Sequence, residues 1–336
     1  MRQWIIAKGA TSLDGLTLKE APVPNAGPGE VLVRVRACSL NYRDQAIPLG
    51  VYIGGPVGED CVPLSDGAGE IAAVGAGVTG LNEGDRVAGT FFRDWIDGPP
   101  NPAVGPALGA AGALGMLQDY VVLPAHGVVK IANSLSFEEA ACLPCAGVTA
   151  WHALMGGPKP LKAGESVLVL GTGGVSLLAL QIAKAAGATV VATSSSDDKL
   201  ERVRGLGADH CINYRTTPDW GLEAAKITGG IDHVVEVGGA GTLAQSIAAV
   251  GFAGEIGLIG VLTRQGDTSP HGLMFKGASI RGIFVGSKAM AEALYAFVDR
   301  HGIKPVIDRT FPIEQALEAY AYQSSPVLFG KVVITL

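Results

Sequence analysis

The residues with the clearest chemistry form a glycine turn between a hydrophobic run and a helical pattern. Residues 166–170 (SVLVL) resemble a buried strand, and residues 175–186 have the pattern of a helix. Gly171 permits a tight turn, and Gly173 has no side chain to keep a pyrophosphate from the backbone. Ser176 departs from the GxGxxG/A pattern, and the alternative is an ordinary strand–turn–helix connection. Because helix N-termini favour phosphates, we predict a dinucleotide bound by Gly171, Thr172, Gly173, Gly174 and Val175.

The end of the next predicted strand indicates which dinucleotide binds. Strand 189–193 runs into Ser194, Ser195 and Ser196, and Lys199 lies in the following helix. NAD-binding sheets commonly have an acidic residue here, which would repel a 2′-phosphate, whereas hydroxyls and an ammonium bind it. We therefore expect NADPH, bound by Ser194, Ser195 and Lys199. Alternatively, the serines cap the helix and the lysine is solvated.

The order of the elements favours an α/β fold. Strands alternate with helices over residues 131–286, as in βαβ units of a doubly wound parallel sheet. The expected strands are 166–170, 189–193, 211–213, 233–237, 255–259 and 279–285, and the expected helices are 136–154, 175–186, 199–206 and 243–250. Residues 1–130 show short strands and turns, and residues 287–336 end in a helix, a strand, a helix and a strand. We expect residues 131–286 to bind the dinucleotide, and 1–130 with 287–336 to form a β-rich domain. Residues 91–116 show no periodicity and are expected to form a surface loop or lid.

Five motifs together resemble medium-chain dehydrogenase/reductases. They are residues 41–44 (NYRD), 65–70 (SDGAGE), 84–87 (GDRV), 143–151 (LPCAGVTAW) and 171–175 (GTGGV). The resemblance covers essentially the whole chain. It is greatest to the zinc-independent quinone oxidoreductase branch and to nearby bacterial alcohol dehydrogenase-like proteins. It implies a Rossmann domain, a GroES-like β-rich catalytic domain, a nicotinamide in the cleft between them, and a homodimer or homotetramer.

The resemblance also adds site residues. Tyr214 would join Ser195 and Lys199 around the 2′-phosphate, unless its ring packs under the sheet. Thr149 would lie beside the nicotinamide. Open α/β sheets bind ligands at the carboxyl ends of their strands, so two further strand ends should meet the nicotinamide. The residues expected there are Gly260, Val261, Ile283 and Val285.

Whether the chain binds a catalytic zinc depends on which ligand residues it has. Alcohol dehydrogenases of this superfamily hold a catalytic zinc with a Cys, a His and a second Cys. The matching positions here are Asn41, Ser65 and Cys145, of which only the last is a usual ligand. The four-cysteine run of the structural zinc site is absent, and the Cys142–Cys145 pair alone is explained by core packing. We therefore expect no metal.

A hydride acceptor without a metal needs hydrogen-bond donors for its developing oxyanion. Asn41 offers an amide and Tyr52 a hydroxyl, and with Thr149 these are the predicted catalytic residues. Tyr42 and Arg43 are second-rank candidates. The alternatives are that Asn41 caps a helix starting near Tyr42 and that Tyr52 lines a loop.

The composition limits the partners. The chain has 336 residues, a net charge of −6 and no basic cluster, which argues against nucleic acid or an anionic membrane. The apolar run 167–183 is interrupted by glycines, which argues against a membrane span. The five cysteines lack a disulfide spacing, so we expect a cytoplasmic protein.

The predicted function is hydride transfer from NADPH to a quinone or α,β-unsaturated carbonyl without zinc. The first alternative is an alcohol dehydrogenase or carbonyl reductase of the same superfamily. The second is an NADPH-binding sensor or structural protein with little turnover. The small-molecule substrate is expected to be a carbonyl compound or a quinone.

Overall fold

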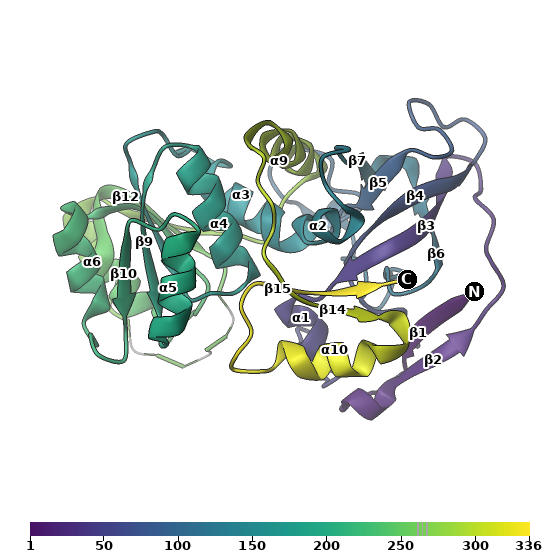
Figure 1. Cartoon of the computed structure of the whole chain (residues 1–336), viewed down its shortest axis with the longest axis horizontal. Helices are drawn as coiled ribbons and strands as arrows, with labels where there is room; N and C mark the ends of the chain where they lie inside the picture. The colour runs from purple at the N-terminus through teal and green to yellow at the C-terminus, as the bar shows by residue number, and fades with distance from the viewer. Residues whose placement is uncertain (261, 264, 267) are drawn as a thin grey trace. The chain divides into compact units, whose positions relative to one another are not determined.

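The structure is a computed structural model that describes residues 1–260, 262–263, 265–266 and 268–336. The chain forms two compact units, and Figure 1 labels many of their elements. The first unit joins residues 1–148 to residues 286–336. The second unit is residues 149–285.

A six-stranded parallel sheet forms the centre of the second unit. Its strands are β8 (Ser166–Leu170), β9 (Thr189–Ser194), β10 (His210–Asn213), β11 (Ile231–Glu236), β12 (Val250–Leu258) and β13 (Ser279–Gly282). They lie in the order β10-β9-β8-β11-β12-β13, with every neighbouring pair parallel. This is the doubly wound order, with its switch point between β8 and β11. The predicted Rossmann sheet is confirmed.

One helix precedes these strands, and the others connect them. The helices are α3 (Val148–Leu154), α4 (Gly174–Ala185), α5 (Asp197–Gly205), α6 (Trp220–Thr228), α7 (Leu243–Ala249) and α8 (His271–Lys276). Helix α4 begins one residue before its predicted start. Helix α5 begins two residues before its predicted start, because Ser196 is its N-cap. Helices α6 and α8 were not predicted.

The first unit is built on a seven-stranded sheet, in which β14-β15-β3-β4-β5-β7 form one path and β6 also pairs with β3. Only the β14–β15 pair is parallel among these pairings. The strands are β3 (Glu30–Ser39), β4 (Asp66–Val74), β5 (Arg86–Gly89), β6 (Tyr120–Pro124), β7 (Val128–Lys130), β14 (Ile307–Pro312) and β15 (Lys331–Thr335). Strands β1 (Arg2–Ile6) and β2 (Leu16–Glu20) form a separate antiparallel pair. This β-rich unit matches the predicted GroES-like fold.

Short helices complete the first unit. The α-helices are α1 (Tyr42–Ala46), α2 (Phe137–Ala141), α9 (Lys288–His301) and α10 (Ala316–Gln323). Single turns are η1 (Leu13–Gly15), η2 (Pro102–Val104), η3 (Ala125–Gly127), the π-type turn η4 (Leu143–Gly147) and η5 (Ile313–Gln315). Ser136 caps α2 as predicted, and its Oγ accepts from the Glu139 N–H at 3.2 Å.

One segment lies in a different unit from the one its sequence pattern indicated. Residues 131–148 were predicted to belong with the dinucleotide-binding region, but they pack with the first unit. Helix α2 contacts β3, β4 and β15, and its residues Ala140 and Ala141 are fully buried. The burial of these small apolar residues therefore decides which unit the segment joins. Its helical sequence pattern, which continues into the following residues, does not. The assignment of a separate function to each domain stays a prediction.

The Gly/Pro-rich stretch 91–116 is exposed and irregular over residues 96–103, as predicted for a surface loop, but aromatic and other apolar residues near its two ends are buried. The side chains of Phe91, Phe92 and Trp95 are each at most 3% exposed, and Met116 is fully buried. The carbonyl of Trp95 accepts from the Lys288 N–H at 2.8 Å at the start of α9. The aromatic side chains thus fix an irregular backbone to the first unit.

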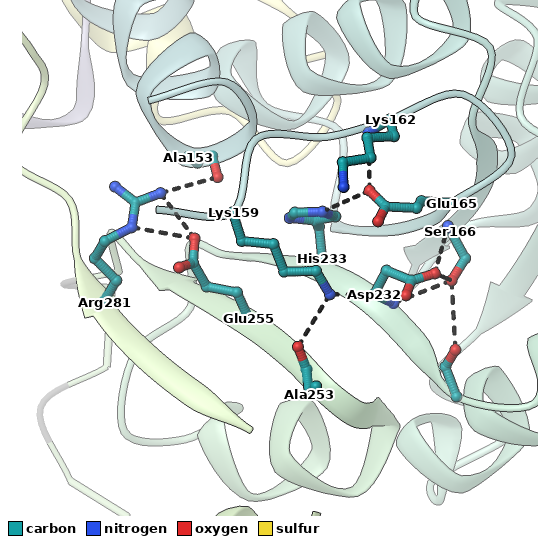
Figure 2. A network of polar contacts seen from close by, with 11 residues as sticks. Ala153, Lys159, Lys162, Glu165, Ser166, Asp232, His233, Ala253, Glu255 and Arg281 are labelled. Atoms are coloured by element: carbon teal, nitrogen blue, oxygen red, sulfur yellow. Dashed lines mark hydrogen bonds and ion pairs between the residues drawn. The ribbon is translucent and has the colours of Figure 1, made fainter. Parts of the chain in front are cut away.

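A polar network lies at the amino ends of the strands of the second unit (Figure 2). His233 is 2% exposed, and its Nε2 lies 3.1 Å from Glu165 Oε2. Burial lowers the pKa of His233, although the neighbouring Glu165 carboxylate opposes this shift. Arg281 donates to the buried Glu255 at 2.8 Å. The network pairs charged side chains at the amino ends of the strands, away from the carboxyl ends where ligands bind such sheets.

In the part of the chain that the structure describes, no helix has the length and apolar character needed to cross a membrane.

Candidate active site

The turn after β8 leaves open the space that a phosphate needs. Gly171 has φ of +73°, in the left-handed region that glycine tolerates. Gly173 is the N-cap of α4 with φ of −80° and ψ of 173°, a backbone that any residue can adopt. A Cβ atom at Gly173 would meet no atom within 4 Å. The backbone is thus open at a helix N-terminus, where the predicted residues 171–175 suit a pyrophosphate.

Ser176 replaces the last glycine or alanine of the usual pattern but keeps the helix close to the strand. Its side chain is 1% exposed, and its Oγ donates to the Leu170 carbonyl at 2.6 Å. The last glycine or alanine of the pattern allows close packing of helix and strand. A serine fits here because its hydroxyl satisfies a carbonyl at the end of the strand.

Three strand ends converge beside this turn. The Gly171 N–H donates to the Thr193 carbonyl at 2.9 Å, joining the turn to the end of β9. The Tyr214 N–H donates to the Ser194 carbonyl at 3.0 Å, joining the end of β9 to the residue after β10. Ser194 is 3% exposed and Tyr214 is 41% exposed. The structure therefore brings Ser194 and Tyr214, two of the predicted 2′-phosphate residues, together at the carboxyl ends of β9 and β10.

The start of α5 separates the serines from the aspartates that follow them. Ser196 Oγ accepts from the Lys199 N–H at 3.4 Å, so the capping alternative holds for Ser196. Asp197 and Asp198 occupy the exposed first turn, where carboxylates favour the helix dipole. Asp197 Oδ1 accepts from Asn213 Nδ2 at 2.8 Å. Ser195 and Lys199 are partly exposed.

A buried carboxylate shapes the loop after β11. Glu236 is fully buried, and its carboxylate accepts from the N–H groups of Gly238 and Gly239 at 2.7 and 2.9 Å. The hydroxyls of Thr242 and Ser246 also donate to it. A Cβ atom at Gly260 would lie 2.4 Å from the Gly239 nitrogen, so only glycine fits there. Sequence reasoning missed Glu236, because a single acidic residue ending a hydrophobic strand has no distinctive signature.

The residues predicted near the nicotinamide lie at the ends of β12 and β13. The Ile283 N–H donates to the Leu258 carbonyl at 2.9 Å. Val285 has φ of +52°, a strained conformation for a β-branched residue, and its carbonyl lies 2.7 Å from Nδ1 of His152. Thr149, 3% exposed, lies with His152 on α3. Val261 lies outside the described residues.

A cluster of buried polar groups surrounds Asn41 in the first unit. Asn41 is 8% exposed and is the N-cap residue of α1, as the capping alternative predicted. Its N–H donates to Asp44 Oδ2 at 2.7 Å. Its Oδ1 accepts from Lys331 Nζ at 2.5 Å, and its Nδ2 is buried on the side of Asp66 with at least one N–H group unpaired. Lys331 is 4% exposed, and Asp66 is fully buried.

The other candidates lie on the same short helix or just after it. Arg43 is 6% exposed, and its Nη1 donates to the Leu108 carbonyl at 2.8 Å. Its guanidinium lies 5.4 Å from the centre of the Tyr52 ring. The Tyr52 N–H donates to the Ala46 carbonyl at 3.2 Å, which places Tyr52 at the carboxyl end of α1. Tyr42 is 53% exposed.

Burial raises the pKa values of two carboxyl groups in this cluster. It raises the pKa of Asp44 to about 6, against the opposing charge of Arg43. It also raises the pKa of Asp66, although Lys331 and hydrogen bonds from Ser65 and the Cys145 N–H oppose the shift. A hydrogen bond from the Asn41 side-chain amide lowers the pKa of Asp66 as well, so one Nδ2 N–H is directed at that carboxyl group.

The donor set does not suit zinc. At the three matching positions, Asn41 Oδ1 already accepts from a buried ammonium, and Ser65 Oγ donates to Asp66 Oδ1 at 2.7 Å. Burial and the neighbouring Asp66 raise the pKa of the Cys145 thiol, which opposes the thiolate that a metal requires. Among the described residues, no three His, Cys, Asp or Glu side chains are grouped as metal ligands would be.

Sequence reasoning missed Lys331 and gave Asp66 no role. Lys331 begins the apolar strand KVVIT, where a charged residue resembles a solvated strand end. Its partner Asn41 is 290 residues away in the chain. The only available signal was a lysine that directly precedes a run of buried apolar residues.

Two family models match the chain. Residues 27–133 match the alcohol dehydrogenase GroES-like domain, and residues 174–300 match the zinc-binding dehydrogenase family. These ranges fall in the β-rich unit and over most of the parallel-sheet unit, respectively.

Similar proteins cover nearly the whole chain. A zinc-type alcohol dehydrogenase-like protein of Schizosaccharomyces pombe is 47% identical over 99% of both chains. The 2-methylene-furan-3-one reductase of Solanum lycopersicum is 32% identical over 96% of this chain and 76% of its own length. A crystal structure from Sinorhizobium meliloti 1021, assigned as an alcohol dehydrogenase, has a TM-score of 0.88 and 42% identity over all of both chains.

Proposed function

Because the chain belongs to the medium-chain dehydrogenase/reductase superfamily, we propose that it transfers hydride from NADPH to a quinone or an α,β-unsaturated carbonyl without zinc. That the chain is an oxidoreductase of this superfamily follows from its relatives. The cofactor, the acceptor and the absence of a metal step are the proposal.

The observation that carries the proposal is the state of the three positions that match zinc ligands. Asn41 and Ser65 are engaged in hydrogen bonds with the side chains of Lys331 and Asp66, and burial raises the pKa of the Cys145 thiol. A simple alcohol or ketone benefits from Lewis-acid activation. A conjugated acceptor already has a lower barrier to hydride addition, so hydrogen-bond donors suffice for it. The name 2-methylene-furan-3-one denotes such a conjugated ketone, and its reductase is one of the relatives.

The preference for NADPH rests on charge. Ser194, Ser195 and Tyr214 lie at the adjoining ends of β9 and β10, where an NAD-binding sheet commonly has a carboxylate. The nearest carboxylate along the chain, Asp197, is bonded to Asn213. Hydroxyls and the Lys199 ammonium would bind a 2′-phosphate there.

We assign the following binding and catalytic roles to residues of the chain. The open backbone at Gly173 binds the pyrophosphate, and the serines and Lys199 bind the 2′-phosphate. When bound, NADPH supplies the hydride, which adds to the electrophilic carbon of the acceptor. Asn41 Nδ2 donates to the acceptor's oxygen as negative charge develops on it. Solvent or Tyr52 supplies the proton that completes the reduction.

The test is NADPH consumption by purified, exhaustively chelated protein given a simple quinone or enone, with NADH alongside. Rapid oxidation of NADPH but not of NADH would support the proposal. A requirement for added zinc would refute the zinc-free step. Equal rates with NADH would refute the 2′-phosphate site.

The second candidate function is an alcohol dehydrogenase or carbonyl reductase. The name of the 47% identical relative, a zinc-type alcohol dehydrogenase-like protein, favours it. Chelator-sensitive oxidation of a simple alcohol would establish this candidate in place of the first.

We also propose a homodimer or homotetramer in the cytoplasm. The five free cysteines suit a reducing compartment. Size-exclusion chromatography with light scattering would refute the assembly if it gave a monomer at micromolar concentration.

A further inference from the structure

Lys331 is a buried ammonium held against the predicted catalytic amide. It is the first residue of β15 and is 4% exposed. Its Nζ donates to the Leu40 carbonyl at 2.6 Å and to Asn41 Oδ1 at 2.5 Å. A buried lysine is costly unless its charge is compensated, and the carboxyl groups of Asp44 and Asp66 are close enough for its charge to lower their pKa values.

These charges favour one orientation of the Asn41 amide. The oxygen faces the ammonium of Lys331, and the amide group lies close to the carboxyl of Asp66. Flipping the amide would turn its N–H groups toward the ammonium and its oxygen toward the carboxyl. Both contacts would become repulsive, so the two charged groups select the same orientation.

The selected orientation keeps a donor available. Nδ2 carries two N–H groups and is buried; one N–H is directed at the Asp66 carboxyl group, and the other has no hydrogen-bond partner. An unpaired buried donor costs about 1–3 kcal/mol, which a fold retains where the donor serves a ligand. A freely rotating amide would present its oxygen half of the time, and that oxygen would repel a developing oxyanion.

We propose that Lys331 is a positioning residue that locks the Asn41 amide so that one of its two N–H groups stays available to donate to the acceptor's carbonyl oxygen. The inference rests on the proposed hydride transfer to a carbonyl or quinone. Lys331 itself touches neither substrate nor cofactor in this account, because both of its hydrogen bonds go to Leu40 and Asn41.

The test compares Lys331→Met, Lys331→Arg, Asn41→Ala and the double variant Asn41→Ala/Lys331→Met. The control is Lys276→Met, because Lys276 Nζ donates to three backbone carbonyls in the second unit, those of Ile247, Ala248 and Val250, at 2.9, 2.9 and 2.7 Å. The kcat with a quinone should fall roughly 10-fold or more in Lys331→Met, with the Kd for NADPH unchanged within about 2-fold. Lys331→Arg should recover part of this loss. Lys276→Met should lower the Tm and leave kcat unchanged.

The double variant separates positioning from general stability. If Lys331 acts through Asn41, Lys331→Met should lower kcat no further in the Asn41→Ala background. Independent, multiplied losses of kcat would overturn the inference. So would a Lys331→Met enzyme with wild-type kcat.

A readout that needs no turnover keeps the inference distinct from the proposed function. Asn41 is one of six asparagines, so selective ¹⁵N-asparagine labelling resolves its side-chain amide, which Asn41→Ala identifies. Its two N–H signals should shift and exchange faster in Lys331→Met than in Lys276→Met. Unchanged signals would overturn the inference even if the protein is a reductase. Shifted signals in a protein that reduces no acceptor would instead refute the proposed function.

Discussion

Replacing Gly173 with valine should abolish tight NADPH binding while leaving the fold nearly intact. The backbone at this position, with φ of −80° and ψ of 173°, lies in a region that valine adopts without strain. A Cβ atom there meets nothing within 4 Å, so the protein itself has room for the side chain. The expected loss of stability is the poorer N-cap, about 1 kcal/mol or less.

The cost to binding should be larger than the cost to stability. The valine methyl groups would occupy the space in front of the first N–H groups of α4, where we place the pyrophosphate. Losing one or two charge-assisted hydrogen bonds, at about 1.5–3 kcal/mol each, raises the Kd by about 10-fold for one weak bond and by about 10⁴-fold for two strong ones. The two effects therefore separate in a single variant.

The assay is titration of NADPH fluorescence, with thermal unfolding of the same samples. Gly221→Val is the matched control, because a Cβ atom there would lie 2.1 Å from the Gln245 carbonyl oxygen. That variant should lower the Tm strongly and leave the affinity of the folded fraction unchanged. Wild-type NADPH affinity in Gly173→Val would refute the placement of the phosphate in the glycine turn.

Two further predictions concern charge. Ser195→Asp should weaken NADPH binding at least about 10-fold and spare or improve NADH binding, because a carboxylate repels the 2′-phosphate. Isothermal titration with both cofactors measures the two affinities. Equal losses of affinity for NADPH and NADH would contradict the prediction. Burial lowers the pKa of His233 below 6.5, so the unfolded chain binds a proton first, and stability should fall as the pH drops through 6.5 toward the folded pKa. His233→Gln should reduce this slope by up to about 1.4 kcal/mol per pH unit in denaturant melts, and an unchanged slope would contradict the prediction.

The sequence predicts local elements well where hydrophobic runs and turn residues coincide. Strand β8 was predicted with its observed bounds, because SVLVL is followed at once by glycine. Two helices that contain glycine near their start were not predicted from the sequence. Helices α6 and α8 each have glycine as their second residue, which obscures the helical pattern.

Long-range packing could not be read from the chain. The stretch 91–116 lacks periodicity, yet its aromatic side chains are core residues, because burial of large rings does not require regular backbone. The cluster of Asn41, Asp66 and Lys331 joins three distant segments. Only the β15–β3–β4 pairing, which no local signal specifies, brings these segments together.

The most direct test of the central claim is the rate of NADPH oxidation by chelator-treated protein with a simple quinone, measured before and after zinc is added back. The account predicts rapid oxidation of NADPH, little oxidation of NADH and no gain from zinc. Activity that appears only after zinc is restored would contradict it, because Asn41, Ser65 and Cys145 would then have to rearrange into a metal site that their present bonds oppose.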